Sequence, residues 1–189
     1  MDVIQEKLQN IKALILDGDG VFFTGSETRG VLPTGETVIY KTRSLQDGQG
    51  ISFLRALGIR IVFATGEGQP LDSIVAKLNA LPSVADGTWP PVELFTKLLA
   101  RESKVASIEA WLSTHNLSWD ECGYIGDDRT DLEAMQRAGL KVAPANAMRV
   151  ITRIADLTLT RAGGDGAIRE FAELVLDARG IDEATLPSA

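Results

Sequence analysis

The sequence predicts an α/β fold in which a doubly wound parallel sheet carries helices on both faces. Short apolar segments alternate along the chain with longer amphipathic segments, as expected for strands joined by helices. Three of the apolar segments, 13–17, 59–65 and 122–125, run directly into acidic or hydroxyl side chains. The carboxyl ends of parallel strands share one edge of the sheet, where folds of this class bind their ligands. We therefore expect the polar residues after these strands to form one site.

The other elements follow from hydrophobic periodicity and from stop signals such as Gly58. In order, we expect a strand at 13–17, a helix at 48–57, a strand at 59–65, a helix at 71–81, a short strand near 84, an extended segment at 92–95, a helix from 103 or 104 to 114, a strand at 122–125, a helix at 129–138, a strand at 140–143, a short helix from 147, a strand near 157–159 and a final helix at 167–178. This regular alternation favours the doubly wound arrangement.

The segment 22–46 differs from the rest, because turn-forming residues flank an alternating stretch from Val38 to Tyr40. This pattern is typical of a β-hairpin. We expect one domain over residues 1–189, with a β-hairpin insert at 22–46 in place of a large cap, and a tail loop with a C-terminal helix at 162–189. So small an insert leaves the site open, and a neighbouring subunit is the obvious means of closing it.

Composition limits the classes of partner. The chain of 189 residues carries a formal net charge of −7, which argues against binding to nucleic acid. The N-terminus is polar and acidic rather than typical of a signal peptide. No apolar run approaches the roughly 20 residues that a membrane helix needs. We therefore expect a cytoplasmic protein that binds no membrane. The acidic charge also means that a site acting on phosphate would need a bound cation.

The polar residues at the strand ends suit phosphoryl transfer. A carboxylate such as Asp17 can attack phosphorus and form an aspartyl-phosphate, and Mg²⁺, which prefers oxygen ligands, can hold phosphate and carboxylates together. A threonine hydroxyl and a lysine can balance the phosphoryl oxygens. An acidic turn or a solvated helix start would explain single members of this set, but not all of them together. The motifs are Asp17-Gly18-Asp19-Gly20-Val21, Thr65-Gly66, Lys104 and Gly126-Asp127-Asp128-Arg129-Thr130-Asp131.

With these motifs in this order, the sequence resembles the haloacid dehalogenase-like hydrolases from about residue 11 to about residue 176. Within them it resembles the 3-deoxy-D-manno-octulosonate 8-phosphate phosphatases, on the segments 47–51 and 162–170. Lys104 is preferred to Lys97 because it precedes Gly126 by 22 residues (126 − 104), the spacing of the family.

The resemblance implies a role for each motif residue. Asp17 is the nucleophile, and Asp19 is first the general acid and then the base. Asp17, the Asp19 carbonyl and Asp127 hold Mg²⁺. The residues implied to bind phosphate or substrate are Thr65, Gly66, Lys104, Gly163 and Gly164, and Thr65 and Lys104 are also implied to act in catalysis. Asp128 and Asp131 either ligate the metal, directly or through water, or orient Lys104. The glycine-rich tail loop is expected to reach a neighbour's site in a homotetramer.

The implied function is a magnesium-dependent phosphomonoesterase that acts through an aspartyl-phosphate on a small phosphorylated sugar or sugar acid. The resemblance favours 3-deoxy-D-manno-octulosonate 8-phosphate or a related nonulosonate phosphate. However, Glu67 and Gln46 stand where the related phosphatases usually carry arginines, the natural partners of a carboxylate. The phosphatase chemistry is therefore expected to be intact, while the substrate does not follow automatically.

Two alternatives remain open. One is a catalytically impaired oligomeric partner that keeps the fold, which the loss of both arginines makes conceivable. The other is a phosphoacceptor switch similar to a receiver domain. Asp19 argues against the switch, because such domains have no acid or base two residues after the acceptor.

Overall fold

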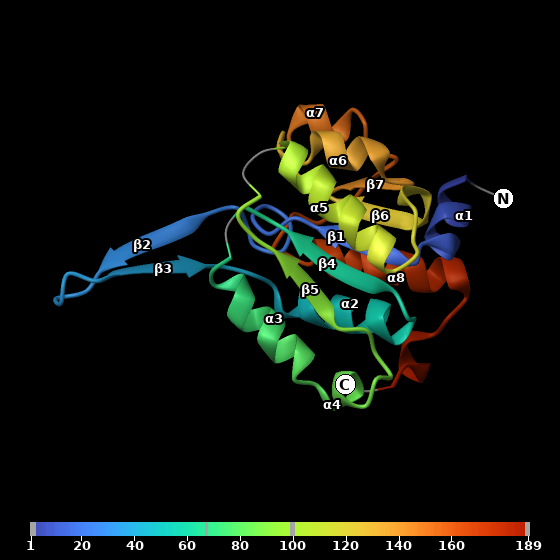
Figure 1. The fold of residues 1–189 in the computed structure, drawn as a ribbon, viewed down its shortest axis with the longest axis horizontal. Coiled ribbons are helices and arrows are strands. Elements are labelled where there is room, and N and C mark those ends of the chain that lie inside the picture. The colour runs from blue at the N-terminus through green and yellow to red at the C-terminus, as the bar shows by residue number, and fades with distance from the viewer. Residues whose placement is uncertain (1–2, 67, 99–100, 188–189) are drawn as a thin grey trace.

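The computed structural model describes residues 3–66, 68–98 and 101–187. Its centre is a six-stranded sheet in which every neighbouring pair is parallel (Figure 1). The strands lie in the order β5 (Val92–Phe95), β4 (Arg60–Ala64), β1 (Ala13–Leu16), β6 (Cys122–Ile125), β7 (Leu140–Ala143) and β8 (Leu157–Thr158). The predicted fold class is confirmed.

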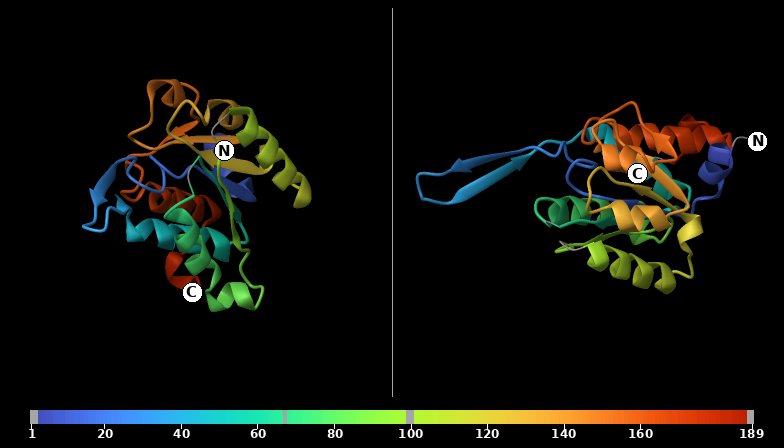
Figure 2. Two further views of the ribbon diagram at one scale, coloured as in Figure 1. Left: turned by 60° about the vertical axis from the view of Figure 1, so that its left-hand side comes forward. Right: turned by 90° about the horizontal axis from the view of Figure 1, so that it is seen from above.

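Helices cover both faces of the sheet (Figure 2). Side chains of β1 alternate between the two faces, so that Leu14 and Leu16 pack with one set of helices and Ala13 and Ile15 with the other. The first set is α1 (Val3–Asn10), α2 (Leu45–Ala56), α3 (Leu71–Asn79) and α8 (Ala167–Arg179), and the second is α5 (Arg101–Thr114), α6 (Leu132–Arg137) and α7 (Arg149–Thr152). No helix among the described residues is long and apolar enough to cross a membrane.

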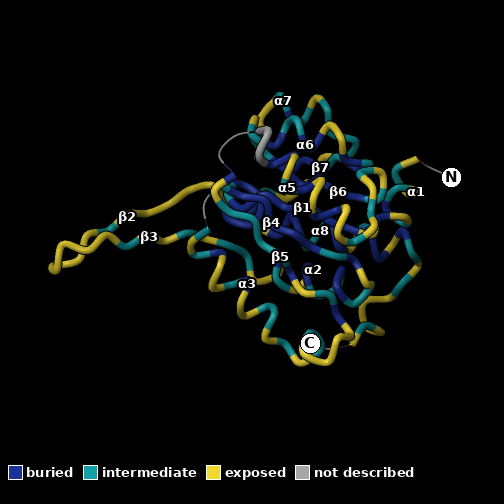
Figure 3. The backbone as a smooth tube through the Cα atoms, viewed as in Figure 1, coloured by how far each residue is buried: buried dark blue, intermediate teal, exposed yellow. Residues whose placement is uncertain are grey.

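The expected hairpin is present as β2 (Glu27–Val31) and β3 (Thr37–Lys41), an antiparallel pair that projects from the body of the protein (Figures 1 and 2). It is exposed along most of its length (Figure 3). Val31, Ile39 and Tyr40 are 73%, 46% and 63% exposed. An isolated two-stranded hairpin is marginally stable in water, and in the single chain no other element covers these apolar side chains among the described residues.

Four local expectations were wrong or incomplete. The segment near Val84 is not a strand but the short helix α4 (Pro82–Ala85), which begins with a proline at a position that suits a helix start. Helix α1 was not predicted. Helix α2 begins at Leu45 rather than 48, because the Ser44 side chain accepts a hydrogen bond from the Gln46 amide. Helix α6 begins at Leu132 rather than 129.

Asp47 joins the start of α2 to the start of α8. Its carboxylate is fully buried and accepts hydrogen bonds from the amides of Gly166 (3.2 Å) and Arg169 (3.0 Å). Burial raises the pKa of this carboxyl group, although the amides oppose the shift. Gly50 allows the two helices to touch, since a Cβ atom there would lie 2.8 Å from the Arg169 Cα atom. These contacts hold the start of α8 against the start of α2.

Candidate active site

Three adjacent strands deliver the site residues to one edge of the sheet. Asp17 follows β1, Thr65 follows β4 and Asp127 lies two residues beyond β6, and β4, β1 and β6 are consecutive in the sheet. A cavity of about 200 Å³ opens at this edge. It is lined by Asp17, Asp19, Thr65, Gly66, Leu98, Lys104, Asp128 and Thr130. Five of the residues expected from the sequence to act in catalysis or phosphate binding therefore line one cavity.

Lys104 connects two of the acids. Its ammonium group donates to Asp17 Oδ1 at 2.9 Å and to Asp131 Oδ1 at 2.7 Å, and its side chain is only 1% exposed. Burial alone would lower the pKa of this lysine, but the charges and hydrogen bonds of Asp131 and Asp17 more than offset burial and raise it. Lys104 is thus a permanent cation at neutral pH.

Asp131 is held by four donors and is fully buried. Besides Lys104, Oδ1 accepts from the Tyr124 hydroxyl at 2.8 Å, and Oδ2 accepts from the amides of Asp127 (3.1 Å) and Asp128 (3.3 Å). Tyr124 was not foreseen from the sequence; a tyrosine two residues before Gly126 in an apolar strand was its only signal. The carboxylate of Asp131 therefore orders the loop after β6 and orients Lys104.

Asp128 contributes differently from Asp131. Its Oδ1 atom accepts from the Thr130 amide at 2.7 Å and from the Thr130 hydroxyl at 2.6 Å. This local turn explains why α6 starts later than expected, because it holds the intervening residues outside the helix. Asp128 remains at the cavity wall.

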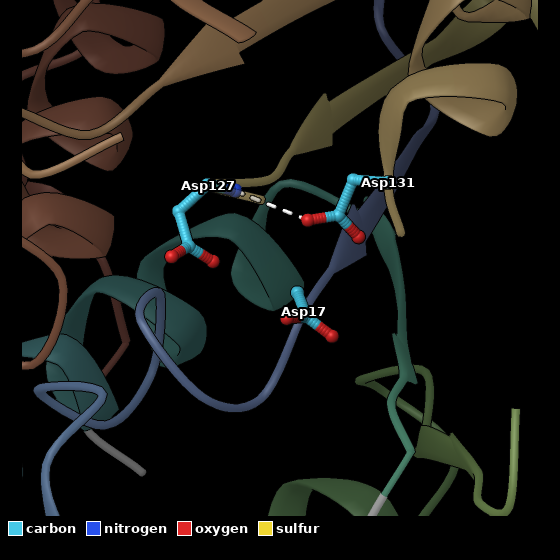
Figure 4. Close-up of side chains that lie close together, drawn as sticks. All are labelled: Asp17, Asp127 and Asp131. Atoms are coloured by element: carbon cyan, nitrogen blue, oxygen red, sulfur yellow. Dashed lines mark hydrogen bonds between the residues drawn. The ribbon is translucent and has the colours of Figure 1, made fainter. Parts of the chain in front are cut away.

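Three carboxylates converge beside Lys104. Asp17, Asp127 and Asp131 each offer one oxygen, and these oxygens lie within 4.8 Å of one another (Figure 4). Burial, followed by the charge of Asp131, raises the pKa of Asp17 well above its usual range. Burial and the charges of Asp131 and Asp128 raise the pKa of Asp127 to about 7.

Asp127 Oδ1 is buried and has no hydrogen-bond partner among the described residues. A buried polar atom without a partner is costly, and carboxylate oxygens are the ligands that a hard divalent cation prefers. The residues present therefore fit a divalent metal ion. The Asp19 carboxylate lies outside this cluster; the sequence prediction placed its backbone carbonyl, not its side chain, at the metal.

Two glycines after β1 bring these groups close. A Cβ atom at Gly20, where φ is +82°, would lie 2.1 Å from Asp127 Oδ2. A Cβ atom at Gly18 would lie 2.8 Å from the Thr65 hydroxyl. Only glycine permits so close an approach, and at Gly20 it also permits the left-handed backbone.

Asp19 forms an ion pair with a second lysine. Lys41, the last residue of β3, donates through Nζ to Asp19 Oδ2 at 2.7 Å. No local pattern in the sequence indicates this contact, because the two residues come from different elements that meet only in the fold.

Gly163 and Gly164 lie against the loop that follows β1 in their own chain. The Gly163 amide donates to Asn146 Oδ1 at 2.6 Å, the Gly164 amide donates to the Val21 carbonyl at 2.8 Å, and Asn146 Nδ2 donates to the Gly20 carbonyl at 2.9 Å. Both glycines are buried and neither is among the described residues that line the cavity. They support the loop after β1 within their own chain. A role in phosphate binding stays a prediction.

The structure describes one of the two positions at which the related phosphatases usually carry an arginine. Gln46 lies in the first turn of α2, is exposed and is not among the cavity-lining residues described. Glu67 lies outside the described residues.

Comparisons with known proteins agree with this geometry. A family model described as haloacid dehalogenase-like hydrolase matches residues 71–171. The 3-deoxy-D-manno-octulosonate 8-phosphate phosphatase KdsC of Escherichia coli (strain K12) is 33% identical over 97% of this chain and 88% of that protein. The protein of the same name from Haemophilus influenzae is 30% identical over 94% of this chain and 89% of that protein.

A solved structure extends the likeness to three dimensions. The 3-deoxy-D-manno-octulosonate 8-phosphate phosphatase of Moraxella catarrhalis, in complex with a magnesium ion, a phosphate ion and KDO, matches with a TM-score of 0.76 and 26% identity. The match covers 95% of this chain and 94% of that chain. These findings confirm the predicted enzyme class, a phosphatase. The chain belongs to the haloacid dehalogenase-like hydrolases, and its similarity to their 3-deoxy-D-manno-octulosonate 8-phosphate phosphatases extends over nearly all of its length.

Proposed function

We propose that this chain is a magnesium-dependent phosphomonoesterase that acts through an aspartyl-phosphate on a small phosphorylated sugar or sugar acid. The observation that carries the proposal is the ion pair between Lys104 and Asp17 beside a partnerless Asp127 oxygen. A nucleophilic carboxylate, a fixed cation and a place for a metal thus share one edge of the sheet.

Asp17 is the nucleophile. Its Oδ1 atom is fixed by Lys104, so the other oxygen can attack phosphorus while the bond to the leaving alkoxide breaks. Thr65 and Gly66, at the cavity wall, can donate hydrogen bonds to the phosphoryl oxygens, and Lys104 balances their charge. Water then cleaves the aspartyl-phosphate and restores the Asp17 carboxylate.

Asp19 moves the protons. It donates one to the leaving oxygen in the first step and takes one from the attacking water in the second, so its own protonation state is restored. Its side chain is 41% exposed at the cavity, where a bound substrate's leaving group can reach it.

Mg²⁺ would be held by Asp17, the Asp19 carbonyl and Asp127. When bound, it neutralises the carboxylates and the phosphate that meet there. Asp131 is less suited to ligate directly, because four donors already occupy its oxygens. Asp131 instead orients Lys104 and the loop that carries Asp127.

The function is tested by phosphate release from a panel of sugar phosphates and sugar-acid phosphates with Mg²⁺ present. We expect turnover that is lost in excess chelator and restored by added Mg²⁺. Full activity in chelator would contradict the metal assignment, and no turnover of any substrate with saturating metal would favour the catalytically impaired partner. An aspartyl-phosphate that persists for minutes would favour the switch.

Metal binding should depend on pH. Asp127, with its pKa raised to about 7, must lose its proton before it can ligate. The affinity for Mg²⁺ should therefore rise with pH, and this proton contributes up to about tenfold per pH unit below about 7. Calorimetric titration of the metal-free protein with Mg²⁺ at about pH 5.5, 6.5 and 7.5, a range that brackets this pKa, measures the dependence; equal affinities would contradict it.

The substrate class is the finer part of the proposal. The similarity to 3-deoxy-D-manno-octulosonate 8-phosphate phosphatases favours that compound or a related nonulosonate phosphate. Because Gln46 and Glu67 replace arginines, we expect the substrate's carboxylate to be recognised differently from the usual mode of those enzymes. The panel should therefore include neutral sugar phosphates alongside 2-keto sugar acids.

We also propose a homotetramer in which the hairpins form the central contacts. The exposed apolar side chains on β2 and β3 support it. Light scattering should give four times the chain mass of 20.3 kDa, and Val31→Glu should lower the assembled mass, while Val3→Glu, a similarly exposed change on α1, should not. A wild-type monomer with full activity would contradict this assembly. That the 163–166 loop also reaches a neighbour's Asp17 stays a prediction.

A further inference from the structure

Lys41 lies where the hairpin rejoins the body of the protein. Its side chain is only 4% exposed, whereas the Asp19 side chain to which it donates is 41% exposed. A buried ammonium group is costly unless it is paired. The partly exposed acid is therefore tied to a cation that has little freedom to move.

The backbone on both sides of this pair is fixed by other contacts. The amides of Phe22 and Phe23 donate to the Gly18 carbonyl at 3.0 and 2.9 Å, which closes the loop around Asp19. The Thr24 amide donates to the Thr42 carbonyl at 3.0 Å, which ties this loop to the residue after β3.

The ring of Phe23 adds a further restraint, since its centroid lies 5.7 Å from Lys41 Nζ. With the backbone held, the ion pair sets the remaining side-chain torsions of Asp19.

Lys104 and Lys41, whose side chains are both little exposed, contact different acids. Lys104 contacts the nucleophile Asp17 and also Asp131, which orients Lys104. Lys41 contacts Asp19. Lys104 comes from α5 and Lys41 from the hairpin. The hairpin thus supplies a side chain to the site in addition to projecting from it.

We propose that Lys41 is a positioning residue for Asp19. It holds the carboxylate at the cavity in the orientation from which Asp19 exchanges protons with the leaving oxygen and then with water. Lys41 keeps its own protons and transfers none. The proposal rests on the proposed function, because it requires Asp19 to be the acid and base.

A double-mutant cycle tests it with p-nitrophenyl phosphate and a hexose 6-phosphate as the probes and Mg²⁺ saturating. Lys41→Met should lower kcat at least about tenfold with KM changed less than about threefold, since acid–base contributions are worth about 10²–10⁴ in rate. The loss in kcat/KM should be larger for the hexose phosphate, whose alkoxide needs the proton more than the nitrophenolate does. Lys41→Arg should restore much of the loss, and Lys77→Met, which removes an exposed lysine from α3, should change nothing.

In the Asp19→Asn background, Lys41→Met should change the residual rate less than about twofold, because the residue through which Lys41 acts is already absent. An equal loss in both backgrounds, or a raised KM with kcat unchanged, would overturn the proposal. If the residual rate is too small to measure, equal losses in kcat/KM for Lys41→Met on the two probes would overturn it instead, because kcat/KM reports the step in which the leaving group departs. If Asp19→Asn itself turns over at the wild-type rate, the acid–base assignment fails, and the two failures are thereby distinguished. Circular dichroism of each variant verifies folding.

Discussion

Asp17→Asn is expected to abolish turnover while leaving the fold intact. An amide is a poor nucleophile, so formation of the aspartyl-phosphate should slow by at least about 10⁴-fold, which corresponds to about 5.5 kcal/mol of barrier. The amide oxygen can still accept the hydrogen bond that Lys104 now donates to Oδ1 at 2.9 Å. Single-turnover measurement of phosphate release with saturating Mg²⁺ reads the chemical step directly.

The same Asp17→Asn change that abolishes activity should leave the metal-free protein at least as stable as the wild type. The raised pKa of Asp17 means that the folded protein disfavours its charged form, first through burial and then through repulsion from Asp131. When the pKa of a carboxyl group is higher in the folded than in the unfolded protein, the free energy of unfolding falls as pH rises above the unfolded pKa. The neutral amide removes this loss, so metal-free Asp17→Asn should be at least as stable as the wild type at about pH 7.

Asp72→Asn, an exposed change on α3, is the matched control and should leave both quantities unaltered. A single-turnover rate for Asp17→Asn within about tenfold of the wild type would mean that another residue attacks phosphorus.

The sequence indicated that these polar residues would gather at one edge of the sheet, because they follow strands. Asp17, Thr65 and Asp127 each stand at or just beyond the carboxyl end of an apolar segment, and parallel pairing of adjacent strands brings such ends together. Lys104 was found through its spacing from Gly126 in the resembled family, not from helix periodicity. The assignment of the edge therefore needed both strand patterning and the family's spacing.

What the sequence did not predict depends on contacts between distant elements. Lys41 reaches Asp19 across the base of a hairpin whose direction no local pattern specifies. Tyr124 has the pattern of an ordinary strand residue, and only the loop after β6 places Asp131 beside its hydroxyl.

The tail glycines illustrate a different limit. Glycine is required wherever backbone or ligand approaches closely, and a sequence does not distinguish the two. At Gly163, a Cβ atom would lie 1.8 Å from the Gly20 carbonyl oxygen, so backbone packing alone accounts for glycine there. A short strand was expected near Val84, whereas Pro82 fits the first turn of the helix that is present.

Removing the cation of Lys104 should have the largest effect on stability. In Lys104→Met, the buried carboxylates of Asp17 and Asp131 lose the group that now lies 2.9 and 2.7 Å from them. Breaking a buried pair from one side costs about 3–5 kcal/mol. The cost should be greatest without metal and partly recovered by Mg²⁺, which would neutralise the same cluster.

The pH dependence follows from the same charges. Lys104 has a raised pKa, so its contribution is fully present below its ordinary pKa and is lost only in strong alkali. Without this lysine, the carboxylates are charged only at a cost, and the metal-free variant should lose stability as pH rises from about 5 to about 8. Urea unfolding with and without Mg²⁺ across that range measures both effects.

Lys141→Met provides the matched control for Lys104→Met. Lys141 also pairs with an aspartate, Asp156, at 3.2 Å, but both side chains are 22% exposed. Partly exposed pairs contribute about 1 kcal/mol or less, so this variant should lose little stability and respond little to Mg²⁺. Equal losses in the two variants, or a loss at Lys104 that Mg²⁺ does not reduce, would mean that Lys104 does not balance the charge of a metal-binding carboxylate cluster.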